Sequence, residues 1–98
     1  MGLEYHVELV MNGMESELDE HQKWVEETAA LAGRHVVVKK AVSNEGFAIA
    51  RFSSHFEADR PMDAQLMGIG LMGPRSASIE VITMVVARMD FPPLSPFV

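Results

Sequence analysis

Apolar and polar residues alternate over residues 3–11, with Val10 as the one exception. This pattern predicts a strand with one buried face and one exposed face. The buried face would carry Leu3, Tyr5, Val7, Leu9 and Met11, and the opposite face would carry Glu4, His6, Glu8 and Val10. Asn12 and Gly13 are expected to end this strand.

Residues 15–32 change to the helical period of 3.6. Acidic residues fill the first turn, as the helix dipole favours, and Gly33 is the expected C-terminal stop. The predicted apolar stripe consists of Met14, Leu18, His21, Trp24, Val25, Thr28, Leu31 and Ala32.

The middle of the chain predicts two further strands joined by a tight turn. Residues 34–42 contain the β-branched run from Val36 to Val38, and residues 47–52 are mostly apolar. The connection over 43–46 ends in Gly46, which suits a left-handed backbone position. Residues 53–60 are polar and are expected to be irregular.

The last third of the chain predicts a short helix over 61–72 and a strand over 76–89. Pro61 suits the first helical position, and Met62, Leu66 and Ile69 lie near helical spacing. Residues 90–98 contain three prolines and predict an extended tail.

The predicted order is therefore β-α-β-β-(α)-β, with helices on one face of an antiparallel sheet. This is the ferredoxin-like arrangement in the α+β class. Residues 1–90 would form a single domain, and residues 91–98 an extended Pro-rich tail. The apolar side chains of that tail predict that it packs on its own domain or on a neighbouring subunit.

Charge is distributed unevenly along the 98 residues, whose net charge is -6. Residues 1–27 hold eight acids and one base, whereas residues 28–98 hold six acids and seven bases. This acidity argues against nucleic-acid binding and is compatible with a protein partner that has a basic surface. A solvated helix face, kept soluble by its glutamates, explains the same acidity without a partner.

Several classes of site are excluded or disfavoured by the sequence. The chain has no cysteine, which excludes a thiolate nucleophile and a cysteine-ligated metal and permits a reducing compartment. No apolar run is long enough to span a bilayer. We therefore expect a cytoplasmic protein with no membrane contact, no cofactor and no metal.

The run from Gly68 to Gly73 matches the glycine pattern G-x-G-x-x-G of dinucleotide-binding sites. Such a site needs a strand before the motif and a helix after it. Pro74 and a predicted strand follow instead, so we interpret these glycines as a tight loop or as close packing against the sheet.

Two functional hypotheses remain. The first is a non-catalytic protein-binding domain, such as an inhibitor, immunity factor, adaptor or assembly subunit, that uses the acidic helix face. Trp24 or Leu31 would then anchor an interface, although Trp24 is also explained as a cap on the core. The predicted partner-binding residues are Glu20, Trp24, Glu26, Glu27 and Leu31.

The alternative is a small dimeric enzyme or ligand-binding protein with a pocket on the open sheet face. A homodimer is expected under either hypothesis. His6 lies between Glu4 and Glu8 on one strand face, and carboxylates flanking an imidazole can support acid–base chemistry. In this hypothesis Glu4 or Glu8 orients His6, and Arg51 holds an anionic substrate. A solvent-facing sheet with cross-strand charge pairs explains the same residues without a pocket.

Overall fold

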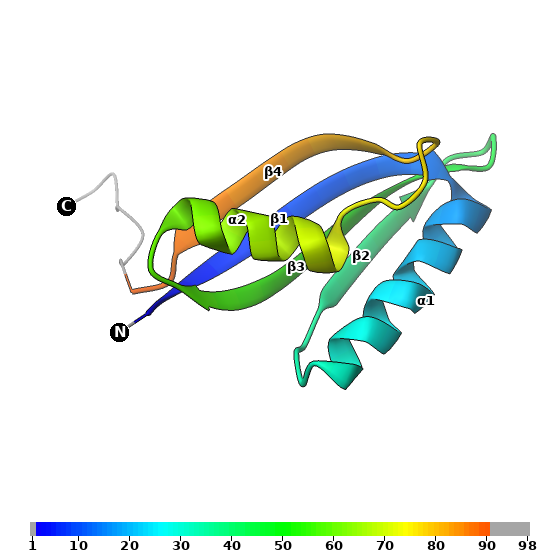
Figure 1. Cartoon of the computed structure of the whole chain (residues 1–98). Helices are drawn as coiled ribbons and strands as arrows, with labels where there is room; N and C mark the ends of the chain where they lie inside the picture. Colours follow the sequence, from blue (N-terminus) through cyan, green and yellow to red (C-terminus); the bar gives the residue numbers. More distant parts are fainter. Residues whose placement is uncertain (1, 91–98) are drawn as a thin grey trace.

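The computed structural model describes residues 2–90 and shows an α+β domain of six elements. Figure 1 shows the path of the chain, which alternates between the sheet and the helices. The elements are β1 (Leu3–Met14), α1 (Glu15–Leu31), β2 (Val37–Val42), β3 (Phe47–Ala58), α2 (Pro61–Met72) and β4 (Glu80–Arg88).

The four strands form one antiparallel sheet in the order β2-β3-β1-β4. β1 is an inner strand that pairs with β3 along its whole length and with β4 on its other side. A register shift between Val10 and Met11 interrupts the pairing with β4. β2 and β4 are the edges of the sheet.

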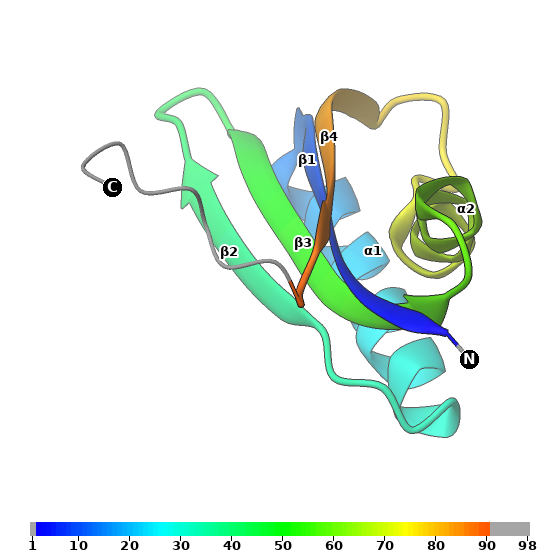
Figure 2. The ribbon, with the colours of Figure 1, turned by 90° about the vertical axis from the view of Figure 1, so that its left-hand side faces the viewer.

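Both helices pack on the same face of the sheet (Figure 2). The core beneath them contains Tyr5, Val7, Leu9 and Met11 of β1, as the alternation predicts. From α1 it takes Leu18 and Val25, which are fully buried. The prediction of an antiparallel sheet with helices on one face is therefore confirmed.

Two strands are longer than predicted. β1 continues through Asn12 and Gly13, and β3 continues to Ala58 instead of ending at Phe52. The interpretation of residues 53–60 as irregular was wrong because their polar composition hid a two-residue alternation. Ser54, Phe56 and Ala58 face the core, whereas Ser53, His55 and Glu57 face outward.

The α1 helix matches its predicted bounds, but its apolar stripe was partly wrong. Ala29 is buried, whereas Leu31 is 92% exposed. The His21 ring is buried, and its Nε2 donates a hydrogen bond of 2.8 Å to the backbone oxygen of Met72. This bond satisfies a carbonyl in the last turn of α2 and joins the two helices.

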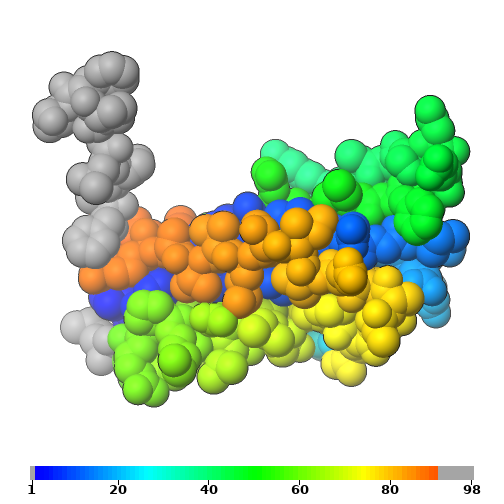
Figure 3. Space-filling view, turned by 90° about the horizontal axis from the view of Figure 1, so that it is seen from above, coloured from blue at the N-terminus to red at the C-terminus, as the bar shows by residue number. Residues whose placement is uncertain are grey.

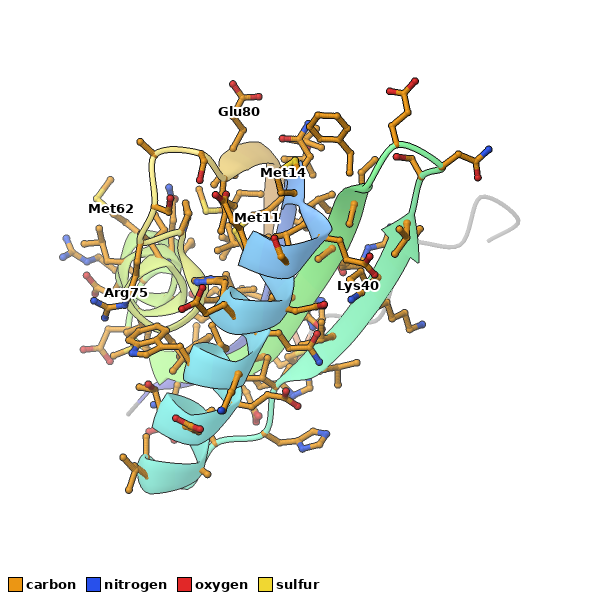
Figure 4. All side chains as sticks on the ribbon, turned by 90° about the vertical axis from the view of Figure 1, so that its right-hand side faces the viewer. Met11, Met14, Lys40, Met62, Arg75 and Glu80 are labelled. Atoms are coloured by element: carbon orange, nitrogen blue, oxygen red, sulfur yellow. The ribbon has the colours of Figure 1, made fainter. Side chains whose placement is uncertain are left out.

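Lys40 joins α1 to the edge strand β2. Its ammonium group donates a hydrogen bond to Asp19 and lies 3.6 Å from Oε2 of Glu15. The hydrogen bond to Asp19 raises the pKa of Lys40. Figure 4 shows the Lys40 side chain between β2 and the first turns of α1.

The α2 helix faces the sheet with Ala64 and Gly68, joined near its C-terminal end by Leu71 and Met72. Ala64 and Gly68 are buried, whereas Met62 and Leu66 are 65% and 61% exposed. Figure 3 shows α2 lying along one side of β4, and Figure 4 shows Met62 pointing away from the core. Small side chains on the inner side let the helix approach β1 closely.

Gly68 is where that approach is tightest. A Cβ atom on Gly68 would lie 2.4 Å from Cγ1 of Val7, which is far inside van der Waals contact. The glycine run therefore lies in a helix and its C-terminal turn, and at Gly68 it serves close packing against the sheet.

The predicted tail, residues 91–98, lies outside the described residues.

Alanine at Gly68 and alanine at Gly70 form a matched test of this packing, because no atom lies within 4 Å of a Cβ on Gly70. Gly68→Ala should lower the free energy of unfolding by about 1–3 kcal/mol through overpacking. Gly70→Ala should raise it by up to about 1 kcal/mol through helix propensity. Chemical denaturation measures both changes, and equal effects of the two variants would contradict the close approach.

Candidate functional site

The face of the sheet opposite the helices carries most of the polar residues of the strands. The register places these side chains in rows across neighbouring strands. Read along β1, the rows are Glu4 and Glu57; His6, His55 and Ala87; Glu8, Ser53, Val37 and Val85; and Val10, Arg51, Lys39 and Thr83. We call this surface the open face.

Two imidazoles meet on the open face. His6 of β1 and His55 of β3 are direct cross-strand partners, and their ring centroids lie 5.3 Å apart in an edge-to-face arrangement. Each ring also has its own carboxylate. Nε2 of His6 lies 3.5 Å from Oε1 of Glu8, and Nδ1 of His55 lies 3.9 Å from Oε1 of Glu4.

These contacts leave one nitrogen of each ring for another partner. A carboxylate that interacts with one imidazole nitrogen favours a proton there, so the other nitrogen can accept or donate a proton. On His6 the second nitrogen is Nδ1, and on His55 it is Nε2. The pair can therefore act as an acid and a base toward one bound molecule.

Two arginines flank the histidines. Nε of Arg51 lies 3.5 Å from Oε2 of Glu8, so Glu8 contacts both Arg51 and His6. Arg34, in the segment before β2, donates a hydrogen bond of 3.0 Å to the backbone oxygen of His55. Its guanidinium also lies 4.6 Å from the ring centroid of Phe56, which fixes the position of the charge.

A hollow of about 320 Å³ lies beside β3 where its pairing with β2 has ended, and it is lined by both histidines and Arg34 but not by Arg51, Glu4 or Glu8. This volume is within the range of small-molecule sites, although the hollow is open on one side. The residues that line it are His6, Gly33, Arg34, His35, Val37, Ser53, Ser54 and His55. Ser54 belongs to its floor, since it is buried and donates a hydrogen bond of 2.8 Å to the backbone oxygen of His35.

The candidates for the open-face site are only partly brought together. Glu8 contacts both His6 and Arg51, but Arg51 does not line the hollow. The cation at the hollow is Arg34, which was not predicted from the sequence to be a site residue. Within residues 2–90, no group of three or more acidic or histidine side chains is arranged to hold a metal ion.

His55 was not predicted as a site residue, because residues 53–60 were expected to be irregular. The alternation of Phe52, Ser54, Phe56 and Ala58 was the available signal, and it places His55 on the same face as Arg51. For Arg34 the sequence held no such signal, because its place depends on how the segment before β2 crosses the end of β3.

The acidic side of α1 lies on the helix-covered half of the molecule. Glu20, Glu26 and Glu27 are exposed, and within the described residues they form no ion pair. Trp24 is different, because Cζ of Arg75 lies 3.5 Å from its ring centroid. Figure 4 shows Arg75 beside α1, so Trp24 is covered by a residue of its own chain.

No protein-family model matches this sequence, and no curated protein shows significant similarity to it. Neither helix within residues 2–90 has the length and apolar character that a bilayer crossing requires.

The pairing of the two histidines can be tested by NMR. His6→Ala should shift the ring-proton resonances of His55, because a ring 5.3 Å away contributes a ring current that the variant removes. The ring of His21, which is buried on the other side of the sheet, should keep its resonances and serves as the internal control. Unchanged His55 resonances would contradict the register of β1 and β3.

Proposed function

We propose that the protein binds a small organic anion in the hollow of the open face and exchanges protons with it. The observation that carries this proposal is the pairing of His6 with His55, each beside its own carboxylate, at the wall of that hollow. The side chains of His6 and His55 are 32% and 48% exposed, so a ligand in the hollow can reach both rings.

The charge of the ligand follows from Arg34. Its hydrogen bond to His55 and its position over Phe56 hold a guanidinium at the hollow without a carboxylate partner among the described residues. A fixed guanidinium binds carboxylate and phosphate groups well. The hydroxyl of Ser53 adds a neutral hydrogen-bonding group.

The chemistry open to this site is proton transfer. A neutral imidazole accepts a proton from the ligand while the protonated imidazole beside it donates one, so the protein ends with the same number of protons. Glu8 and Glu4 lie 3.5 Å and 3.9 Å from the nearest nitrogens of His6 and His55, close enough to orient the ring that each contacts. An isomerisation that moves a proton within the ligand fits this arrangement.

A titration with sodium acetate and with phosphate, at constant ionic strength, tests the site. We expect saturable changes in the NMR resonances of His6, His55 and the Arg34 side chain. Arg34→Gln should weaken binding by roughly tenfold, the loss of one charge-assisted contact. Arg75→Gln, which removes the same charge beside Trp24, is the matched control and should leave binding unchanged. Non-saturating changes spread over all surface cations would overturn the proposal.

A second candidate function is the capture of a basic protein partner by α1. It is supported by the unpaired carboxylates of Glu20, Glu26 and Glu27 and by the exposed Leu31 at the end of the same helix. Charges on an exposed face of this kind mainly accelerate association and fix orientation. Trp24 contributes to such an interface only if Arg75 moves away from its ring.

The triple charge reversal Glu20→Lys, Glu26→Lys and Glu27→Lys tests this second candidate. A tagged pull-down from the native host should lose its partner, and the salt dependence of capture should disappear with it. Glu45→Lys, Asp59→Lys and Glu80→Lys give the same change in net charge at other exposed positions and should leave capture intact. An unchanged complex with the α1 variant would eliminate the acidic face as the binding surface.

We also propose that the fold is ferredoxin-like and that the protein is cytoplasmic. The strand order β2-β3-β1-β4, with every neighbour antiparallel and both helices on one face, supports the ferredoxin-like arrangement. The absence of cysteine supports a cytoplasmic location.

A further inference from the structure

The open face has more apolar surface than a solvated sheet needs. Val37 and Val85 are each 43% exposed and lie in the row of Glu8, on either side of it. Ile49 and Phe47 form a separate exposed apolar patch at the start of β3, beyond Arg51. Within residues 2–90 both helices lie on the opposite side of the sheet, so no element covers these side chains.

The charges of the open face are separated along the strands. Glu4 and Glu57 are direct cross-strand partners at one end, and Lys39 and Arg51 are direct partners further along. Like charges placed directly opposite each other destabilise a sheet. Glu57 and Lys39 form no ion pair with any described residue, so each row retains an unpaired charge.

These two rows complement each other. They lie six residues apart along β3, from Arg51 to Glu57, which corresponds to about 20 Å of strand. Glu4 and Glu57 form an acidic row at one end of the face, and Lys39 and Arg51 form a basic row near its middle, with the His6 and Glu8 rows between them. A surface with opposite charges in separate rows can pair with itself after a half turn, and two-fold symmetry then forms every contact twice.

We infer that a second copy of this chain covers the open face, with its strands running opposite to those of the first. A two-fold axis in the plane between the sheets and perpendicular to the strands brings Glu57 of one copy over Arg51 of the other. An axis parallel to the strands brings acidic row against acidic row instead. The charges therefore favour the first orientation over the second.

This orientation also closes the hollow. The two-fold axis passes between the row of His6 and the row of Glu8. The His6–His55 pair of each copy therefore faces the Glu8 row of the other copy. Val85 then lies near Ala87 of the other copy and loses its contact with water. The inference concerns assembly and does not require the proposed ligand.

Charge exchange between two variants tests this inference with the full chain. One variant carries Glu4→Lys and Glu57→Lys, and the other carries Lys39→Glu and Arg51→Glu. Light scattering after size exclusion should find the unmodified chain dimeric. Each variant alone should dissociate with a dissociation constant raised by roughly tenfold or more. An equimolar mixture should restore a one-to-one dimer, because unlike charges then meet at both ends, and this recovery also shows that both variants fold.

Glu20→Lys with Glu27→Lys is the matched control, since it makes the same charge change on α1 and should leave the dimer intact. A monomeric unmodified chain would overturn the inference. Variants that remain dimeric alone, or a mixture that fails to recover, would overturn the proposed orientation. If the charge-exchange experiment gives the expected dimers and the anion titration shows no saturable binding, the proposed ligand site is rejected and the dimer is retained.

Discussion

The register of β1 between its two neighbours is the constraint on which the other features depend. Because side chains alternate between faces, a shift of one residue would exchange every buried side chain of β1 with an exposed one. Tyr5, Val7, Leu9 and Met11 specify the register through the core that they build with both helices. The same register sets which residues of β3 lie beside His6 and Glu8.

Much of the fold followed from periodicity. The two faces of β1, the bounds of α1 and the turn at Gly46, whose φ is 82°, were all predictable because each rests on local pattern. The orientation of α2 was not predictable in this way, because that helix has apolar residues on all sides. Only contact with β1 decides that Gly68 faces inward and Leu66 outward.

The candidate site was likewise predictable only in part. The pairing of His6 with Glu8 follows from residues two apart on one strand, so the sequence predicted it. The approach of His55 and Arg34 depends on a strand pairing and a crossing segment that are distant in sequence. A site built from one strand is thus visible in a sequence, whereas its cross-strand half emerges only with the sheet.

The molecule keeps its two charged surfaces on opposite sides of the sheet. The carboxylates of α1 lie on the helical side, and the rows of the open face lie on the other. The Debye length in physiological salt is about 8 Å, so charges on the two sides are largely screened from each other. The proposed partner of α1 and the proposed second copy would therefore use separate surfaces and would not compete.

The contact between Gly68 and Val7 has a consequence for sequence variation. With only 2.4 Å between a Cβ on residue 68 and the Val7 side chain, the identities of these two positions are coupled. In relatives of this chain a larger residue at position 68 would have to accompany a smaller one at position 7, or else α2 would have to move away from the sheet. Covariation between these two positions, which are far apart in the chain, would therefore mark the helix–sheet spacing of this fold.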